Sequence, residues 1–243
     1  MKDVREHIIY EDNDICVCHK PSGVLTQADK GFSQDMVSAL LTYERRKGNK
    51  NPFIAPVNRL DRPVEGLVLY AKNSRVAAAL TKQLTNGGVD KWYYAVVDVN
   101  ADMEEELADS VGTQITLEDY LVKDARTNMS RVASADTAGA KKAVLEYEVI
   151  SVHGGRALLR VKLHTGRHHQ IRVQLSNAGL PIVGDTKYNV NLKDASVPGG
   201  RGSDALALCS YRLAFSHPAT GKKLNYEILP KGTAFAEFKE NNE

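Results

Sequence analysis

An aspartate between two arginines is the first candidate for chemistry in this sequence. Residues 58–70 read NRLDRPVEGLVLY, so Arg59, Asp61 and Arg62 come directly before an apolar run. A positioned, ionised carboxylate can act as a nucleophile or a general base. The two arginines favour the ionised form and suit an anionic substrate. A single aspartate is more often a helix cap or half of a surface ion pair, and that interpretation stays open here.

A histidine-rich turn, HTGRHHQIR at residues 164–172, is the second candidate. The spacing predicts a strand that delivers Thr165, Gly166 and Arg167 to a helix start, where free backbone N–H groups and an arginine favour phosphate. The histidines alone could hold a metal, but no HExxH pattern and no nearby carboxylate completes such a site. We therefore expect no metal. The other interpretation is a helix cap with surface charges.

Two adjacent tyrosines in KWYYAVV, residues 91–97, are the third candidate. Side chains alternate along a strand, so Tyr93 and Tyr94 point to opposite faces. Either one ring lies in the core and one on the surface, or one ring stacks on a nucleic-acid base.

Short strands and a few helices must position these residues. The patterns predict two strands within 7–27 joined by a polar turn at 11–14, then further strands at 66–71, 91–99, 141–152 and 156–163, and a closing hairpin at 211–229. Helices are predicted at 34–47, 73–88 and 168–179, with Asn73 or Ser74 as a cap. This order is typical of an α+β fold, in which a largely antiparallel mixed sheet is flanked by helices and loops. We expect one domain over residues 1–243, with an exposed loop at 189–204.

The composition of the chain excludes few classes of protein. The chain has 243 residues, 42% hydrophobic and 26% charged, with a net charge of +2, which is ordinary for a globular protein and does not by itself indicate a nucleic-acid partner. No Lys or Arg lies between Lys91 and Lys123, whereas 156–187 is rich in them. The segregation indicates either a basic face with an acidic edge or two separate solvated clusters.

The cysteines and the apolar runs indicate the cellular compartment in which the protein works. The three cysteines form no CxxC pair, and Cys16 and Cys18 share one face of a strand as buried thiols. The amino-terminal residues contain no apolar signal core, and no apolar run approaches membrane-spanning length. We expect a reducing, cytoplasmic location and no membrane partner.

Three segments together resemble the RluA family of RNA pseudouridine synthases. NRLDRPVEGLVLYAKN, KWYYAVV and LHTGRHHQIRVQLSNAGLPIVGDTKY are similar to that family's HRLDxxTSGLLLxAK, KxYxAxV and TGRTHQIRVHxxxxGxPIxGDxxY patterns. CHKPSGVLTQ and FSHPATGKKLNYE match in kind and order, so the resemblance covers nearly the whole chain. It implies a single pseudouridine-synthase catalytic domain.

The resemblance implies a role for each matching residue. Asp61 corresponds to the catalytic aspartate, Tyr93 to the tyrosine that packs against the target base, and Arg172 to the basic residue that ion-pairs with the aspartate. The implied RNA-binding residues are Arg59, which holds RNA open around a flipped base, Arg62, and three residues of the turn that contact phosphates or brace the site, Arg167, His169 and Gln170.

The implied reaction is isomerisation of uridine to pseudouridine within structured ribosomal or transfer RNA. Asp61 would either attack C1′ of the ribose or remove the proton from C2′, and the resemblance does not choose between them. No cofactor or metal is required, no DNA partner is expected, and we expect a monomer. A rival from another class is a non-catalytic RNA-binding or ribosome-assembly protein on the same fold. A carboxylate hydrolase unrelated to RNA is a third hypothesis.

Five positions depart from the family pattern: Asn58 replaces His, Val64 and Glu65 replace Thr and Ser, His168 replaces Thr, and Gln174 replaces His. The three implied catalytic residues are intact, so we expect catalysis with an unusual choice of substrate. Because the catalytic pattern begins within the first twenty residues, we expect no S4-like amino-terminal RNA-binding domain of the kind that many relatives carry. Recognition is then expected from the catalytic domain itself, with insertions at 102–119 and 189–204.

Overall fold

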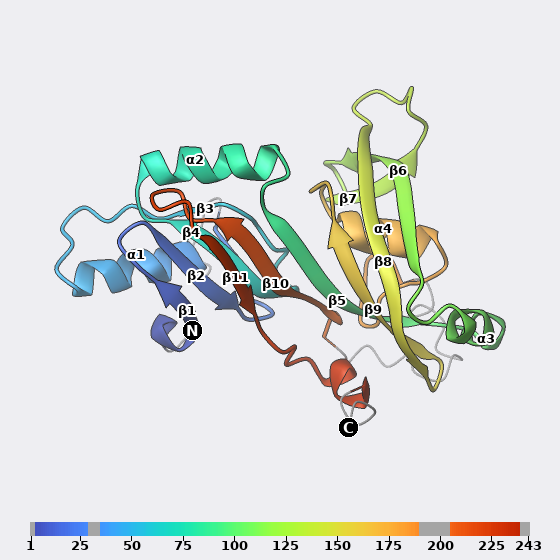
Figure 1. Cartoon of the computed structure of the whole chain (residues 1–243). Helices are drawn as coiled ribbons and strands as arrows, with labels where there is room; N and C mark the ends of the chain where they lie inside the picture. The colour runs from blue at the N-terminus through green and yellow to red at the C-terminus, as the bar shows by residue number, and fades with distance from the viewer. Residues whose placement is uncertain (1–2, 29–34, 190–204, 239–243) are drawn as a thin grey trace. The chain divides into compact units, whose positions relative to one another are not determined.

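A computed structural model describes residues 3–28, 35–189 and 205–238 of the chain (Figure 1). These residues form two compact units. Unit 1 comprises Met1–Asp90 and Ser210–Leu229, and unit 2 comprises Lys91–Cys209 and Pro230–Glu243. Both contain antiparallel strand pairs and helices, which confirms the predicted α+β class.

Unit 1 is built on a sheet whose strands follow the order β1-β2-β4-β10, with β11 beside β10 and the short β3 beside β4. The strands are β1 (Ile8–Glu11), β2 (Ile15–Lys20), β3 (Ala55–Pro56), β4 (Glu65–Ala71), β10 (Leu208–Ser216, in unit 1 from Ser210) and β11 (Lys223–Glu227). β2 and β4 are buried along their whole length, so the segment that precedes β4, which carries Asp61, ends on a rigid strand.

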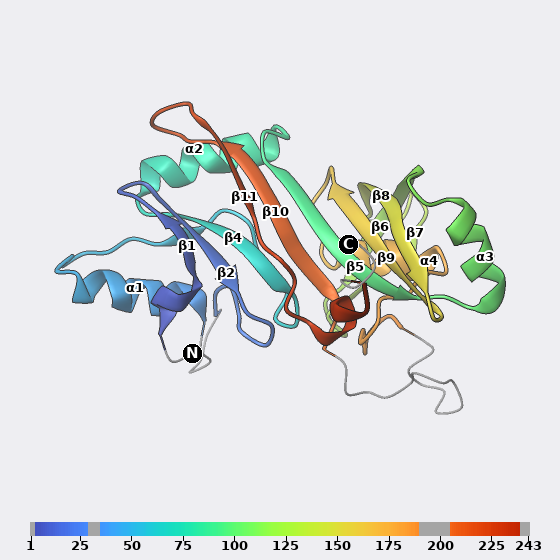
Figure 2. The ribbon, with the colours of Figure 1, turned by 60° about the horizontal axis from the view of Figure 1, so that its bottom comes forward.

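Two helices cover opposite faces of the unit 1 sheet (Figures 1 and 2). α2 (Ser74–Thr85) begins where the Asn73 side chain accepts from the Val76 backbone N–H, and it buries Val76 and Leu80. Those two side chains pack against Ile15 and other residues that share its face on β2 and β4. α1 (Met36–Arg46) is capped by Asp35 and lies on the other face. A 3-10 helix, η1 (Val4–His7), precedes β1.

Gly66 permits a close approach between β4 and β10. Its φ is 133°, and a Cβ atom placed on it would lie 2.5 Å from both the backbone N and the backbone O of Ser210. Any side chain at position 66 would therefore collide with the neighbouring strand, which explains a glycine inside a strand.

The strands of unit 2 pair antiparallel in the order β5-β9-β8-β6-β7. Its strands are β5 (Asp90–Asp98, counted here although Asp90 closes unit 1), β6 (Gln114–Asp124), β7 (Met129–Ala133), β8 (Lys141–His153) and β9 (Arg156–Leu163). α4 (Gln170–Asn177) packs on it through Val173, which meets Leu121 and Ala143. α3 (Ala101–Asp109) and a 3-10 helix, η3 (Thr233–Phe238), complete the unit.

Most predicted elements are confirmed, including the opening strand pair, α1, α2, β5, β8, β9 and the closing hairpin. The helix predicted from 168 begins only at Gln170, because His169 has a left-handed backbone conformation with φ of 54°. The interval 102–119 contains α3 and part of β6, neither of which was predicted as regular structure. The loop expected at 189–204 lies, beyond Asn189, outside the described residues. Among the described helices, none has the length and apolar character to cross a bilayer.

Candidate active site

The residues singled out from the sequence are divided between the two units. Arg59, Asp61 and Arg62 belong to unit 1, and the five others, Tyr93, Arg167, His169, Gln170 and Arg172, belong to unit 2. Each group has a definite geometry within its own unit.

Asp61 lies in a tight turn that leads into β4. Its carbonyl oxygen accepts from the Val64 backbone N–H at 3.1 Å, and its side chain is half-buried. Residues 59–64, called the Asp61 turn from here on, lie beside residues 20–26, which begin at the last residue of β2 and are called the 20–26 turn.

Hydrogen bonds from the 20–26 turn fix the residues on both sides of Asp61. The Thr26 hydroxyl donates to the Leu60 carbonyl at 3.0 Å and accepts from the Leu60 N–H at 3.1 Å. The Gly23 N–H donates to the Arg62 carbonyl at 2.8 Å, and Arg62 Nε donates back to the Gly23 carbonyl at 2.9 Å. Backbone polar groups satisfied in this way hold a loop in one conformation, so the Asp61 carboxylate is presented from a fixed position.

A buried lysine completes this arrangement. Lys20 has 0% of its surface exposed, and its Nζ donates to the carbonyl oxygens of Pro21, Val24 and Arg62 at 3.0, 2.8 and 3.3 Å. Burial lowers the pKa of Lys20 to about 8, while the negative charges of Asp61 and Glu65 act in the opposite direction.

The two arginines of the Asp61 turn are both exposed. Arg62 is held by its bond to Gly23. Arg59 makes no hydrogen bond or ion pair with any described residue. A guanidinium that faces solvent in this way can contact phosphate oxygens.

Two departures from the family pattern in unit 1 point inward. The Asn58 side chain accepts from the Leu69 N–H at 2.8 Å and donates to the Leu67 carbonyl at 3.2 Å, so it pairs with β4 as a strand would. Glu65 is buried, with its carboxylate 3.6 Å from His19 Nε2. The extra negative charge lies in the interior of unit 1 and not on its surface.

Tyr93 is buried on β5, opposite Val161 of β9, whereas its neighbour Tyr94 is half-buried opposite Arg160. The two rings therefore face different sides, as the alternation predicted. Contact between Tyr93 and a target base stays a prediction.

Arg172 is fixed by a second carboxylate. It is 4% exposed, and its Nε and Nη2 donate to the two carboxylate oxygens of Asp185, each at 2.7 Å. Its guanidinium also lies 5.1 Å from the ring centre of Tyr188. A guanidinium has five N–H donors, so this pairing does not use all of its donor capacity. The ion pair that the resemblance implies between Arg172 and Asp61 stays a prediction.

The turn before α4 is braced from within unit 2. The Gln170 side chain accepts from the Arg167 backbone N–H at 2.9 Å and from the Thr165 hydroxyl at 2.8 Å, and it donates to the Val144 carbonyl at 3.1 Å. His169 is buried, with Nδ1 2.7 Å from the Tyr188 hydroxyl. Of the two roles considered for Gln170 and His169, these contacts favour bracing.

Arg167 is the exposed member of this turn. Its Nε donates to the Lys142 carbonyl at 2.8 Å. Because Gln170 already takes the Arg167 N–H, fewer backbone donors remain for an anion than a bare helix start would offer. The phosphate-binding prediction therefore depends mainly on the Arg167 side chain.

Sequence reasoning missed Lys20, Thr26 and Asp185 as parts of the candidate site. The available signals were weak: a lysine at the end of a strand whose first four residues are apolar, and an aspartate within the GDTKY match. Neither signal identifies the more distant partners, which are the Arg62 carbonyl for Lys20 and the Arg172 side chain for Asp185.

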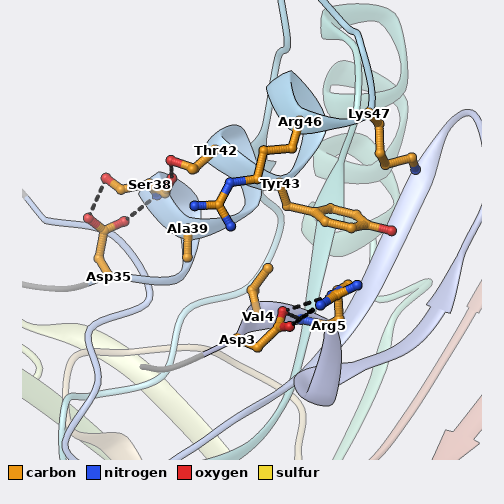
Figure 3. Close-up of a pocket in the computed structure, with 10 residues that line it drawn as sticks. All are labelled: Asp3, Val4, Arg5, Asp35, Ser38, Ala39, Thr42, Tyr43, Arg46 and Lys47. Carbon is orange, nitrogen blue, oxygen red and sulfur yellow. Dashed lines mark hydrogen bonds and ion pairs between the residues drawn. The ribbon is translucent and has the colours of Figure 1, made fainter.

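A cavity of about 540 Å³ lies elsewhere in unit 1, between α1 and η1 (Figure 3). Arg46 extends across it toward the Asp3–Arg5 ion pair, and the Ser38 hydroxyl bonds the Asp35 carboxylate at its rim. None of the residues singled out from the sequence lines this cavity.

Comparison with known proteins gives a consistent result. Residues 14–177 match the model of a family described as RNA pseudouridylate synthase. The chain is 32% identical, over 91% of its length and 68% of the relative's, to an uncharacterized RNA pseudouridine synthase of Aquifex aeolicus. It is 27% identical, over 93% of its length and 69% of the relative's, to ribosomal large subunit pseudouridine synthase D of Zymomonas mobilis. A solved structure of human RNA pseudouridylate synthase domain containing 4 shares the fold, with a TM-score of 0.71 and 21% identity over 94% of this chain and 90% of that one.

Proposed function

This chain belongs to the RNA pseudouridylate synthase family and is an isomerase that converts uridine in RNA to pseudouridine, and on that premise we propose that Asp61 is its catalytic carboxylate and ribosomal RNA its substrate. The family match spans residues of both units. This extent supports the further proposal that residues 1–243 form one catalytic domain.

The fixed position of Asp61 is the observation that supports its role. Four hydrogen bonds with Thr26 and Gly23 hold the residues on either side of it, and the charge of the half-buried carboxylate acts to raise the pKa of the buried Lys20. A reacting group must be held close to its productive geometry, and neighbours locked by hydrogen bonds supply that constraint.

The reaction breaks the N-glycosidic bond between C1′ and N1, turns the uracil, and forms a bond between C1′ and C5. Asp61 acts at the ribose, either by attack on C1′ to form an ester or by removal of the C2′ proton to form a glycal. When the C1′–C5 bond forms, the Asp61 carboxylate leaves C1′ in the ester route, or the proton returns to C2′ in the glycal route. C5 then loses its hydrogen to solvent and N1 gains one, so the atoms balance without an added reactant. Tyr93 packs against the uracil, and Arg172, held by Asp185, supplies positive charge.

Ribosomal RNA is the proposed substrate because the name of the Zymomonas mobilis relative specifies the large ribosomal subunit. The exposed guanidinium groups of Arg59, Arg62 and Arg167 would contact the RNA backbone. Such contacts should weaken as the salt concentration rises. The target base must leave its stack, which favours uridines in loops or at unpaired sites.

Tritium release from [5-³H]uridine-labelled RNA tests this proposal. The RNA is taken from cells that lack the protein, separated into large-subunit ribosomal, small-subunit ribosomal and transfer RNA, and incubated with wild type, Asp61→Asn or Asp61→Ala. The control is Asp136→Asn, which removes an exposed carboxylate from a loop of unit 2. We expect release from large-subunit ribosomal RNA by wild type and the control, and a loss of at least about 10⁴-fold with either Asp61 variant, since a carboxylate that forms or breaks bonds has no substitute.

The outcomes separate the hypotheses. Release with transfer RNA alone would refute the proposed substrate and retain the catalytic role. Release that persists in Asp61→Asn would refute that role. Retained RNA binding without release from any fraction would favour the non-catalytic RNA-binding protein.

A further inference from the structure

The cavity between α1 and η1, called the α1–η1 cavity from here on, is a concave site that the proposed chemistry does not use (Figure 3). Its volume of about 540 Å³ lies within the range of about 300–1,000 Å³ that is typical of ligand sites. All of its lining residues belong to unit 1, so the site is complete within one unit. Packed elements normally leave few voids between them, and a hollow of this size therefore requires an explanation.

The sequence of α1 explains the hollow. The helix buries Met36 and Leu40 on one face. A second stripe, spaced by three and four residues and therefore on one side of the helix, faces η1 and consists of Ser38, Ala39 and Thr42. Large apolar side chains on this stripe would close the gap against η1. These three are small, so the gap stays open, and two of them place hydroxyl groups on its wall.

Arg46 lines this cavity, and its guanidinium makes no hydrogen bond or ion pair with any described residue. Side chains on a helix point back toward its N-terminus. Arg46 is the last residue of α1, and it accordingly extends over the preceding turn and across the cavity (Figure 3). A guanidinium has five N–H donors in a planar fork that matches the oxygens of a phosphate. Arg46 is therefore equipped to bind an anionic group.

The other two cations of the wall already have carboxylate partners. Arg5 Nε donates to the Asp3 carboxylate at 2.8 Å, and this bond lowers the pKa of Asp3 to about 2, with a smaller contribution from the charge of Arg46. Lys47 Nζ donates to the Glu11 carboxylate at 2.7 Å, which raises the pKa of Lys47. Both pairs are ionised at neutral pH, so their charges largely cancel and the charge of Arg46 remains.

The buried carboxylate of the wall lies at the opposite end of α1 from Arg46. Asp35 caps this helix by accepting from the Ser38 backbone N–H and hydroxyl at 2.9 and 2.7 Å. The N-terminal end of the helix dipole stabilises its negative charge. A carboxylate has about four acceptor sites, so these two bonds leave it able to accept from a ligand. The cavity thus has a cationic end that donates and an anionic end that accepts.

These groups match a nucleotide. A nucleotide has an anionic phosphate, ribose hydroxyl groups that can donate, and a planar base that stacks on aromatic side chains. Tyr43 supplies an aromatic wall, and its hydroxyl donates to the Glu11 carboxylate at 3.0 Å, which fixes the ring. Lys47 Nζ lies over one face of the ring, 4.8 Å from its centre, so a base can stack only on the other face.

We propose that the α1–η1 cavity is a second RNA-binding site, which holds one unpaired nucleotide of the RNA with its phosphate on Arg46 and its base against Tyr43. RNA is the source of the nucleotide because the chain belongs to a family that acts on RNA. Two further exposed cations, Arg45 and Lys50, lie at the same end of α1 and suit a continuing RNA backbone. The inference requires that the chain bind RNA, but it does not require the proposed role of Asp61 or ribosomal RNA as the substrate.

Photo-crosslinking tests where the nucleotide lies. The full chain is irradiated with a short single-stranded RNA of mixed sequence in which 4-thiouridine replaces uridine, and the adducts are mapped by mass spectrometry. In parallel, the chain is irradiated with 4-thiouridine 5′-monophosphate. We expect an RNA adduct in the segment of α1 that contains Tyr43. No RNA adduct in α1 would overturn the proposal, and an adduct there with the mononucleotide alone would overturn RNA as the source.

Fluorescence anisotropy with the same RNA tests the phosphate and base contacts separately. Arg46→Gln removes the cation, and Ala39→Phe fills the cavity without a change of charge. We expect each variant to raise the Kd about tenfold, the effect of one charge-assisted hydrogen bond or one stacked base. Arg46→Gln should also reduce the slope of log affinity against log salt concentration by about 0.7, the value for one phosphate of a single strand, whereas Ala39→Phe should keep the wild-type slope.

Arg75→Gln is the matched control. Arg75 is an exposed arginine of another helix of unit 1, α2, and it makes no hydrogen bond or ion pair with any described residue. We expect this variant to keep the wild-type affinity and salt slope. Equal losses in Arg46→Gln and Arg75→Gln would indicate only diffuse attraction between cations and RNA and would overturn the site, as would a wild-type affinity in Arg46→Gln. If Ala39→Phe does not fold, the salt slope of Arg46→Gln and the adduct map decide.

The same experiments distinguish this site from the proposed function. A mapped adduct in α1 that depends on Arg46, with no tritium release by the wild type from any RNA fraction, would overturn the proposed function and leave the second site supported. Release that depends on Asp61, with no adduct in α1, would support the proposed function and overturn the second site.

Discussion

Replacement of Asp185 by Asn removes one charge from a buried ion pair while keeping the shape of the side chain. Asp185 accepts from Arg172 at two positions, both at 2.7 Å, and also from the backbone N–H groups of Lys187 and Tyr188 at 3.0 and 3.1 Å. The asparagine oxygen can keep the backbone bonds and the bond from Arg172 Nη2, but its NH₂ group would face the Nε–H donor of the guanidinium.

The expected loss is large because both partners are shielded from water. The Arg172 and Asp185 side chains are 5% and 0% exposed. Removal of one partner from a buried pair leaves an uncompensated charge and typically costs about 3–5 kcal/mol. We expect Asp185→Asn to lower the free energy of unfolding by that amount, a large part of the roughly 5–15 kcal/mol that natural domains possess.

Urea unfolding followed by tryptophan fluorescence measures this loss within unit 2. The chain has one tryptophan, Trp92, which lies on β5. Glu148→Gln is the control, since the Arg160–Glu148 pair has the same chemistry with 37% and 26% of its side chains exposed. We expect less than about 1 kcal/mol for that surface pair. An Asp185→Asn loss no larger than the control would refute the argument that burial determines the cost.

Two further predictions concern unit 1. Gly66→Ala should destabilise the unit by at least about 4 kcal/mol or prevent its folding, because the new Cβ would lie 2.5 Å from the Ser210 backbone. Circular dichroism and urea unfolding measure this loss, with Gly112→Ala as the control, because φ there is 80° and no neighbouring atom lies within 4 Å of the Cβ position. Equal losses in the two variants would contradict the prediction. Asn58→Ala should cost about 1–3 kcal/mol, because it leaves the buried Leu69 N–H without its partner. The Leu67 carbonyl keeps the bond that it accepts from the Ser210 hydroxyl at 3.5 Å. Urea unfolding measures the loss, and a loss as small as that of Asn51→Ala, at an exposed position, would show that water replaces the amide.

The sequence alone determined most of the secondary structure and the identity of the candidate residues. α2 could be predicted because its signals are local: Asn73 caps the helix, and Val76 and Leu80 form one apolar stripe. Alternation likewise placed Tyr93 and Tyr94 on different faces of a strand. The position of Asp61 directly before a buried strand was visible in the same way, since it depends on residues that adjoin it.

Only the tertiary structure decided which polar groups are buried and what satisfies them. Lys20 and Arg62 are 42 positions apart, and nothing local to either residue reveals that the ammonium of one meets the carbonyl of the other. α4 begins at Gln170 and not at His168, because His169 has a left-handed backbone conformation and the Gln170 side chain accepts from the Arg167 N–H in the preceding turn. The Asp185 partner of Arg172 was equally hidden. Periodicity and caps are properties of neighbouring residues, whereas burial of a charge depends on partners that the folded chain brings from elsewhere.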